Sequence, residues 1–502
     1  MSDDDALLAV VKADCPTCVM ATPALQRLAA QGASLLSQDD PHFPEGIAHV
    51  TDDTDLVLSA RWGIEVVPTL LRVSDGVEVD RVEGWDRARW VEVSGIDGLG
   101  AGLPDRRPGC GSLTLDPSRA DELLVRARSD ELIGRRITLT ALEDDADAYE
   151  ARGWSDGLPV VPPTEARVLR MLECTDRTPG DVVAIVPPDL TPATVEKVAI
   201  NAVLAGCRPE YLPVVLTAVE AACTDAFNMH GLLATTWFAG PMVVVSGPIA
   251  RDISMNDGLG ALGQGNRANA TIGRALNLVV RNIGGGRPGG VDRATLGNPG
   301  KYTFCFAETP APDPDWPNQA TETGLAPDTS AVTLVAAEGV TGIIDQLSRT
   351  PESLARSFAE VLATVAHPKL AFIFDASLVI SPEHLRVFRE AGWNKARLRG
   401  ELSTLLTLDG ADLVRGARDI AEGMPEGFCG GTLPKFREGG LSIFQAGGGA
   451  GMFSAVIGGW AAGDLGSTPV TLPIHTPEEA TTGPPGPLRP PIRFQALSPC
   501  PA

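Results

Sequence analysis

The sequence predicts an α/β protein in which a small N-terminal domain is joined by a Gly/Pro-rich linker to a larger, layered α/β domain. Two observations lead to this prediction. The chain has 502 residues, which is too long for one hydrophobic core. Strand-like apolar runs also alternate with helical periodicity, a pattern typical of α/β folds. We expect four segments, namely the first domain over 1–96, a linker with a charged helix over 97–150, the larger domain over 151–475 and a Pro-rich disordered tail over 476–502.

The net charge and the N-terminal segment argue against several classes of partner and location. The formal net charge is −23, which argues against binding to nucleic acid or to anionic membranes. The N-terminal segment 1–5 carries three aspartates where a signal peptide would be basic, and no apolar run approaches the ~20 residues that span a bilayer. We therefore expect a cytoplasmic protein with no nucleic-acid or membrane partner.

Near the N-terminus, Cys15 and Cys18 have a spacing with known joint chemistry. They follow the strand-like run 7–11 and open the helical pattern 19–30. Unpaired N–H groups at a helix N-terminus favour the thiolate, which is the attacking species in disulfide exchange. Cys18, one turn further on, can then resolve the mixed disulfide. A zinc site would need a second pair of ligands, and no other CxxC or HxxxH occurs.

Further features of this region support the same interpretation. Pro23 follows the second cysteine by five residues, and the segment 63–71 reads G-I-E-V-V-P-T-L-L. A hairpin is expected from strands over 69–74 and 77–83, because Asp75-Gly76 between them is a typical two-residue turn. Together with the CxxC, these features resemble the thioredoxin family over roughly the first 95 residues.

The resemblance implies roles for individual residues. Cys15 would be the nucleophile, Cys18 the resolving thiol and Pro68 a cis-proline beside them, and the cysteine pair would serve without a further cofactor. Two departures leave the redox potential and the partner open. Ala13-Asp14 stands where the family usually has a tryptophan, and Pro16-Thr17 stands where a general thioredoxin has Gly-Pro.

In the linker, Cys110 is flanked by glycines on a segment that we expect to be a mobile arm. Two interpretations stay open. Cys110 is an ordinary linker thiol, or it is a shuttle that carries oxidising equivalents between the CxxC and a distant site.

The larger domain is expected to carry a binding site for a small polar or anionic molecule. Its region 228–308 is rich in Asn, Arg and Gly, and a second glycine-rich loop over 446–454 precedes an expected apolar helix over 455–460. Glycines let a backbone approach a ligand closely, side-chain amides donate and accept hydrogen bonds, and Arg binds oxyanions. The alternative is that these Gly and Asn residues form turns and helix caps. The candidate substrate-binding residues are Asn228, Asn256, Asn266, Arg267, Asn269, Arg274, Lys301, Gly447, Gly448 and Gly449.

Three residues of the larger domain are further candidates for chemistry. Cys305 lies between aromatic residues at a strand-like run, and Cys429 lies in a glycine-rich loop. Either is a candidate catalytic thiol. His230 is the best imidazole candidate for acid–base work. The ligand spacing of a soft-metal site is absent, so no metal ligand is assigned and metal dependence stays open.

A second resemblance covers residues from about 153 to 474. The strings W-S-D-G-L-P-V-V-P-P-T, A-G-C-R-P-E-Y-L-P-V-V, G-N-R-A-N-A-T-I-G-R-A and N-P-G-K-Y-T-F-C-F-A-E resemble a large family of uncharacterised bacterial proteins. This family is associated with thioredoxin-like or Cys/Sec-containing redox proteins described by a U-G-S-C motif. The segment 110–113 matches only the first three positions of that motif. The resemblance supplies a domain boundary and no reaction.

Three functions are compatible with these observations. The first is a thiol-dependent oxidoreductase in which the CxxC module exchanges reducing equivalents with a small-molecule substrate in the larger domain, with a cellular thiol or thioredoxin as reductant. The second is a sulfur transferase or carbon–sulfur lyase that uses a cysteine persulfide or a covalent adduct. The third is a redox-regulated ligand-binding protein. The sequence leaves the oligomeric state open, and an oligomer is compatible with it.

Overall fold

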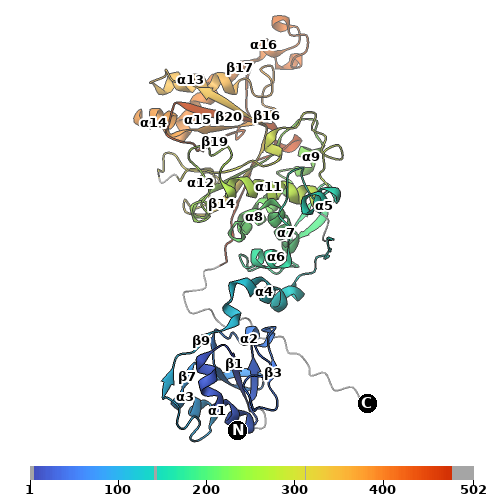
Figure 1. Ribbon diagram of the computed structural model, residues 1–502. Helices are drawn as coiled ribbons and strands as arrows, with labels where there is room; N and C mark the ends of the chain where they lie inside the picture. Colours follow the sequence, from blue (N-terminus) through green and yellow to red (C-terminus); the bar gives the residue numbers. More distant parts are fainter. Residues whose placement is uncertain (1–4, 141–143, 311–312, 478–502) are drawn as a thin grey trace. The chain divides into compact units, whose positions relative to one another are not determined.

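The chain divides into two compact units, Met1–Glu131 and Leu132–Pro477 (Figure 1). The computed structural model describes residues 5–140, 144–310 and 313–477. The predicted tail over 476–502, with Cys500, lies outside the described residues apart from its first two positions. Within the described ranges, no helix is both long and apolar enough to cross a membrane.

Unit 1 is built on a five-stranded sheet in the order β3-β2-β1-β5-β6. The central strand β1 runs parallel to β2 and antiparallel to β5. The predicted hairpin is confirmed, with positive φ angles at Asp75 (53°) and Gly76 (75°) in its turn. The elements are β1 (Asp5–Val11), α1 (Pro16–Ala30), β2 (Ser34–Ser37), β3 (Thr51–Asp52), α2 (Val57–Arg61), β5 (Thr69–Ser74), β6 (Val77–Glu83) and α3 (Arg87–Ser94).

The first part of the predicted linker belongs to unit 1 and is packed against it. Two short antiparallel pairs join it to the domain, β4 with β9 and β7 with β8. The sequence predicted a mobile arm here because Gly and Pro are frequent. The structure differs because residues of this segment form β8 and β9, which pair with β7 and β4 of the domain. The elements are β4 (Val66–Val67), β7 (Trp85–Asp86), β8 (Arg106–Arg107), β9 (Cys110–Gly111) and the predicted charged helix α4 (Ala120–Arg128).

Unit 2 contains two four-stranded sheets. The first has the order β13-β12-β14-β21, and only β12 and β13 run parallel in it. Helix α8 packs on β14 and β21, while α11 packs on β12 and β13. The elements around this sheet are α5 (Asp145–Ala151), α6 (Glu165–Leu172), β10 (Val182–Val186), β11 (Thr191–Thr194), α7 (Val195–Ala205), α8 (Leu212–Ala222), α9 (Met229–Ala234), β12 (Gly240–Ser246), α10 (Pro248–Asp252), α11 (Arg267–Asn282), β13 (Cys305–Ala307), β14 (Ala331–Ala337) and β21 (Val470–Pro473).

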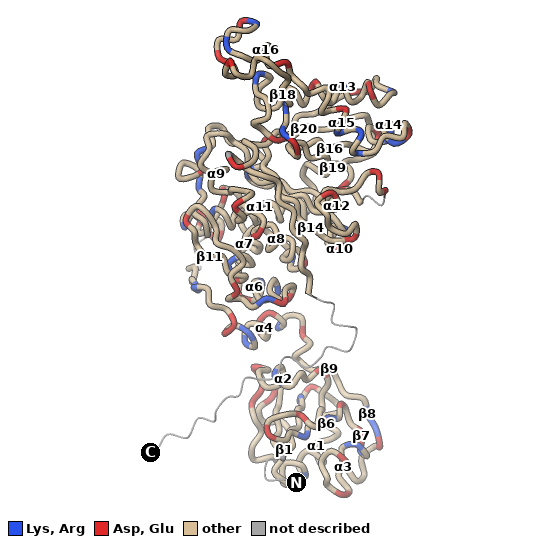
Figure 2. The backbone as a smooth tube through the Cα atoms, turned by 180° about the vertical axis from the view of Figure 1, so that it is seen from behind, with Lys and Arg blue, Asp and Glu red and all other residues tan. Residues whose placement is uncertain are grey.

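The second sheet has the order β15-β20-β16-β19. A buried cluster draws residues from both sheets, with the rings of Phe306 and Phe444 6.0 Å apart. Figure 2 shows the strands of the two sheets almost free of charged residues, as expected where strands such as β12, β14 and β16 are buried along most of their length. The elements are α12 (Gln319–Glu322), β15 (Val340–Ile344), α13 (Pro351–Leu362), β16 (Phe374–Ile380), α14 (Pro382–Glu390), α15 (Lys395–Leu405), β17 (Thr407–Asp409), α16 (Gly410–Leu413), β18 (Thr432–Pro434), β19 (Leu441–Gln445) and β20 (Phe453–Ala461).

One expected helical segment is a strand in the structure. The segment 455–460 is part of β20, which pairs on both sides, with β15 and with β16. A central strand that is buried on both faces is a continuous apolar run, and periodicity does not distinguish it from a short buried helix. Strand β11 forms a hairpin with β10 before α7 begins at Val195.

Candidate active site

Cys15 lies where the chain passes from β1 into α1. Its backbone is extended, and its Sγ accepts a hydrogen bond from the backbone N–H of Cys18 at 3.4 Å, so that the side chain caps the helix. The preceding turn is fixed by Asp39, whose carboxylate accepts from the N–H groups of Ala13 and Asp14 at 2.7 and 2.8 Å. The sulfur is therefore held at the helix N-terminus, where a negative charge is stabilised.

These surroundings lower the pKa of the Cys15 thiol from 9.0 to about 5. The largest cause is a hydrogen bond from the Cys18 side chain, and Cys110 and the backbone N–H groups of Cys18 and Thr17 add to it, while burial opposes them. The pKa of Cys18 is raised, mainly by burial and further by the neighbouring Cys15. At neutral pH the pair therefore consists of a thiolate at Cys15 and a thiol at Cys18.

Strand β4 lies beside this pair. The carbonyl oxygen of Val67 is 3.5 Å from the Sγ of Cys15, and the Val67–Pro68 peptide bond is cis. Pro68 thus lies next to the two cysteines, at the position where the resemblance implied a cis-proline.

The third cysteine of unit 1 reaches the same place from the arm, by which we mean residues 104–114. Strand β9 of the arm pairs antiparallel with β4, and Cys110 stands opposite Val67 in the register. The Sγ atoms of Cys110 and Cys15 are 2.9 Å apart, whereas a disulfide bond is about 2.05 Å long. Burial and the neighbouring Cys15 raise the pKa of the Cys110 thiol.

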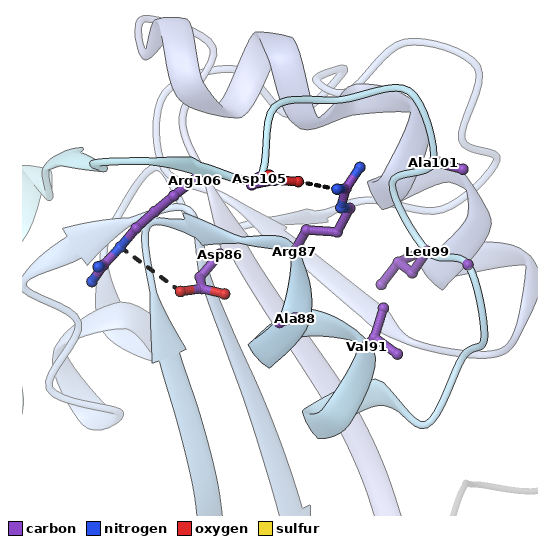
Figure 3. Close-up of a pocket in the computed structure, with 9 residues that line it drawn as sticks. Asp86, Arg87, Ala88, Val91, Leu99, Ala101, Asp105 and Arg106 are labelled. Carbon is purple, nitrogen blue, oxygen red and sulfur yellow. Dashed lines mark hydrogen bonds and ion pairs between the residues drawn. The ribbon is translucent and has the colours of Figure 1, made fainter.

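The start of the arm is fixed at a pocket of about 730 Å³ beside α3. Figure 3 shows Arg87 turned toward Asp105 and Arg106 toward Asp86, and the structure has an ion pair at each place. The indole Nε1 of Trp85 also donates to the carbonyl oxygen of Pro104 at 2.7 Å. These contacts hold the start of the arm against unit 1.

The candidate catalytic residues of unit 2 are dispersed. Cys305 is buried in β13, and burial raises the pKa of its thiol. Cys429 is an exposed free thiol, and His230 is exposed in the first turn of α9. Among the residues that the structure describes, no three His, Cys, Asp or Glu side chains come together as a metal site.

Most candidate substrate-binding residues make hydrogen bonds within unit 2. Asn228 and Asn266 are N-caps of α9 and α11, and the buried Asn269 donates to the carbonyl oxygens of Asn256 and Ala261. The remaining side chains have partners as well. Arg267 donates to the carbonyl oxygen of Gly206, Arg274 forms a bidentate pair with Asp156, Lys301 pairs with Asp292, and Asn256 accepts from the N–H of Gly258.

The loop that contains Gly447, Gly448 and Gly449 does not lead into a helix. It connects β19 to β20, so the helix N-terminus that would favour an anion is absent there. The N–H of Gly447 donates to the carbonyl oxygen of Asp257 at 2.7 Å, and a Cβ on Gly448 would overlap Leu259. Close packing accounts for Gly448, and the positive φ of 117° accounts for Gly447.

A pocket of about 510 Å³ lies within unit 2, between α9, α11 and the segment 286–302. Of the candidate residues, only Lys301 lines it. Sequence reasoning missed its other cation, Arg281, because arginine in an amphipathic helix ordinarily marks the solvent face. Sequence reasoning brought Cys110 to the CxxC only as one of two open interpretations, a shuttle on a mobile arm, and did not predict that Cys110 pairs with Val67 in a strand beside Cys15.

Comparison with known proteins adds no relative. No protein-family model matches the chain, and no curated protein matches it either.

Proposed function

We propose that the protein is a thiol–disulfide oxidoreductase with Cys15 as nucleophile and Cys18 as resolving thiol. The observation that carries this proposal is the position of the Cys15 sulfur at the N-terminus of α1, where it accepts from the N–H of Cys18 and has a second thiol beside it. The lowered pKa of Cys15 agrees with this geometry. A perturbed thiol next to a second thiol is typical of redox centres, because the thiolate is the attacking species.

Two exchange steps make up the reaction. The Cys15 thiolate attacks one sulfur of a substrate disulfide and releases the other as a thiolate. Cys18 then loses its proton and attacks the Cys15 sulfur, which yields the Cys15–Cys18 disulfide and the second substrate thiol. The first step removes the charge of Cys15, which is one cause of the raised pKa of Cys18, so the mixed disulfide makes Cys18 easier to deprotonate.

The arrangement of unit 1 supports a thioredoxin-like assignment. A CxxC at the start of α1, the cis peptide bond before Pro68 and the β5–β6 hairpin are the features that the resemblance implied. A cytoplasmic location fits, since glutathione and thioredoxin keep thiols reduced there. We assign unit 2 the role of holding the small polar or anionic substrate.

The test is multiple-turnover reduction of insulin disulfides with dithiothreitol as electron donor. We expect Cys15→Ser to lose at least about a hundredfold in rate, because a hydroxyl replaces the only thiolate of the pair. In a single turnover without dithiothreitol, the double variant Cys18→Ser/Cys110→Ser, which has no neighbouring thiol to release the substrate, should instead accumulate a mixed disulfide, seen by intact mass. Cys223→Ala, which removes a thiol from unit 2, is the control. Full turnover by Cys15→Ser would overturn the proposal.

A further inference from the structure

We propose that the arm is an internal peptide substrate of this centre and that Cys110 forms a reversible disulfide with Cys15. The inference rests on the proposed function and adds a third redox cysteine to it. The first reason is the distance of 2.9 Å between the two sulfur atoms. Backbone pairing and exposure supply two further reasons.

The backbone of the arm lies against β4 as an added strand would. Besides the pairing of Cys110 with Val67, the N–H of Ser112 donates to the carbonyl oxygen of Glu65 at 2.9 Å. Side chains around the CxxC hold the same segment. Lys12 Nζ donates to the carbonyl oxygen of Gly111 at 3.2 Å, and Thr17 Oγ1 donates to that of Pro108 at 2.7 Å. Extended peptides commonly bind proteins in this way, through main-chain hydrogen bonds to a free strand edge.

Exposure determines which sulfur an outside molecule meets. With the arm in place, Cys15 is 1% exposed and Cys18 is 0% exposed, whereas Cys110 keeps part of its surface in solvent. An external thiol or disulfide therefore reaches Cys110 first, and Cys110 passes the exchange on to Cys15.

The exchange balances with a low-molecular-weight disulfide as oxidant. Cys110, once deprotonated, attacks glutathione disulfide and releases one glutathione. The Cys15 thiolate attacks the Cys110 sulfur and releases the second glutathione, which leaves a Cys15–Cys110 disulfide. Cys18 then attacks Cys15 and releases Cys110. In the reverse sense an external thiolate attacks Cys110 and expels Cys15, a good leaving group because the pKa of its thiol is low.

The first test traps this disulfide. Cys18→Ser is oxidised with glutathione disulfide, alkylated and digested for mass spectrometry. We expect the peptide of Cys15 linked to the peptide of Cys110 in most chains. Cys15 linked to glutathione beside a free Cys110 would overturn the inference and leave the proposed function intact. An unreactive Cys15 would overturn both.

The second test uses two glycines of the arm. A Cβ on Gly109 would lie 2.3 Å from Val66 Cγ1 and 2.7 Å from the carbonyl oxygen of Val67, whereas a Cβ on Gly111 meets nothing within 4 Å. We expect Gly109→Ala to displace the arm, speed alkylation of Cys15 about tenfold or more and lower the yield of the Cys15–Cys110 disulfide. Gly111→Ala should match the wild type. Equal alkylation rates in the two variants would contradict the inference.

An independent observation supports a second proposal, which rests on the assigned role of unit 2. We infer that the 510 Å³ pocket binds an oxyanion, a carboxylate or a phosphate, through Arg281. In the described part of the chain, the Arg281 side chain has no hydrogen bond or ion pair, and its Nε is a buried donor without a partner. Buried polar groups are normally satisfied, so a buried Nε–H without a partner in a pocket indicates a ligand that accepts from it.

The charges around the pocket fit an anion. Burial, and then the neighbouring Arg287, lower the pKa of Arg281, which an anion would relieve. The pocket's other cation, Lys301, is already paired with Asp292 at 2.7 Å, and Asp156 is paired with Arg274. Asp156, itself paired with Arg274, raises the pKa of Arg281 and so offsets its positive charge only in part. The polar side chains of Asn277, Asn298 and Tyr302 line the same pocket.

Calorimetric titration at low salt tests this site with two probes, inorganic phosphate and succinate. We expect at least one to bind the wild type, and Arg281→Gln to weaken its binding by about tenfold or more. Arg251→Gln, at a side chain that is 80% exposed in the same unit, is the matched control. Binding that Arg281→Gln leaves unchanged, or no binding of either probe at about 10 mM, would overturn the proposal. Neither result bears on the thiol chemistry of unit 1.

Discussion

Cys15 and Cys305 are both buried cysteines, yet the pKa values of their thiols move in opposite directions. Cys305 shows the effect of burial, since it lies in an apolar sheet where a thiolate would lose its hydration. Cys15 is buried as well, but the side chain of Cys18, the thiol of Cys110 and two backbone N–H groups stabilise the thiolate. Directed hydrogen bonds at the N-terminus of α1 therefore outweigh the effect of burial on the pKa of Cys15.

The largest expected difference is in the thiolate titration. We expect absorbance at 240 nm, taken as wild type minus Cys15→Ser, to titrate with a midpoint of about 5. Cys305→Ala should leave this midpoint unchanged. Because the pKa of Cys15 is lowered on folding, its contribution to stability is full above pH 9, declines below it and is lost as the pH falls through about 5. A midpoint near 9 would remove the contrast between the two cysteines.

Alkylation of the native protein compares Cys305 with a second cysteine of unit 2, Cys429. Cys305 is buried and its thiol has a raised pKa, whereas Cys429 is exposed. We expect iodoacetamide at pH 8 to modify Cys429 about a hundredfold or more faster than Cys305, because only thiolates that solvent reaches react. Peptide mass spectrometry measures both sites in one sample, and unfolded protein, in which the rates should converge, is the control.

Glu308 extends the comparison to a carboxyl group. Burial raises its pKa to about 7, although Lys395 opposes the shift. Because its pKa is raised on folding, Glu308 contributes fully to stability below pH 4.5. This contribution is lost as the pH rises through about 7. The free energy of unfolding should therefore fall between pH 5 and pH 8, and we expect this fall to be smaller by about 1–3 kcal/mol in Glu308→Gln. Urea unfolding at pH 5 and pH 8 measures it, and equal falls in both proteins would contradict the expectation.

The smallest expected effect concerns Lys12. Its bond to the carbonyl oxygen of Gly111 is exposed, so removal should cost about 1 kcal/mol of arm docking. Lys12→Met should therefore speed alkylation of Cys15 roughly fivefold, less than Gly109→Ala does. A larger effect of Lys12→Met than of Gly109→Ala would show that charge, and not backbone pairing, holds the arm.

Two glycine-rich segments have conformations that their own sequences do not determine. The arm around Cys110 was expected to be mobile, and the structure packs it against β4. The loop 446–454 was expected to precede a helix, and β20 follows it. In both cases the residues are compatible with several conformations. Pairing with strands more than 40 residues away along the chain selects one of them.

Local patterns in the sequence determined the N-terminal strand, the helix that opens at Cys15, the β5–β6 hairpin and the candidate pair of thiols, because each depends on neighbours within a few residues. Tertiary structure alone decided that Cys110 lies at Cys15, that Cys305 is buried and that Arg281 has no partner in its pocket. These three facts depend on which distant strands and helices pack together. Burial and hydrogen bonding across the fold, which no local pattern contains, set the chemistry of each side chain.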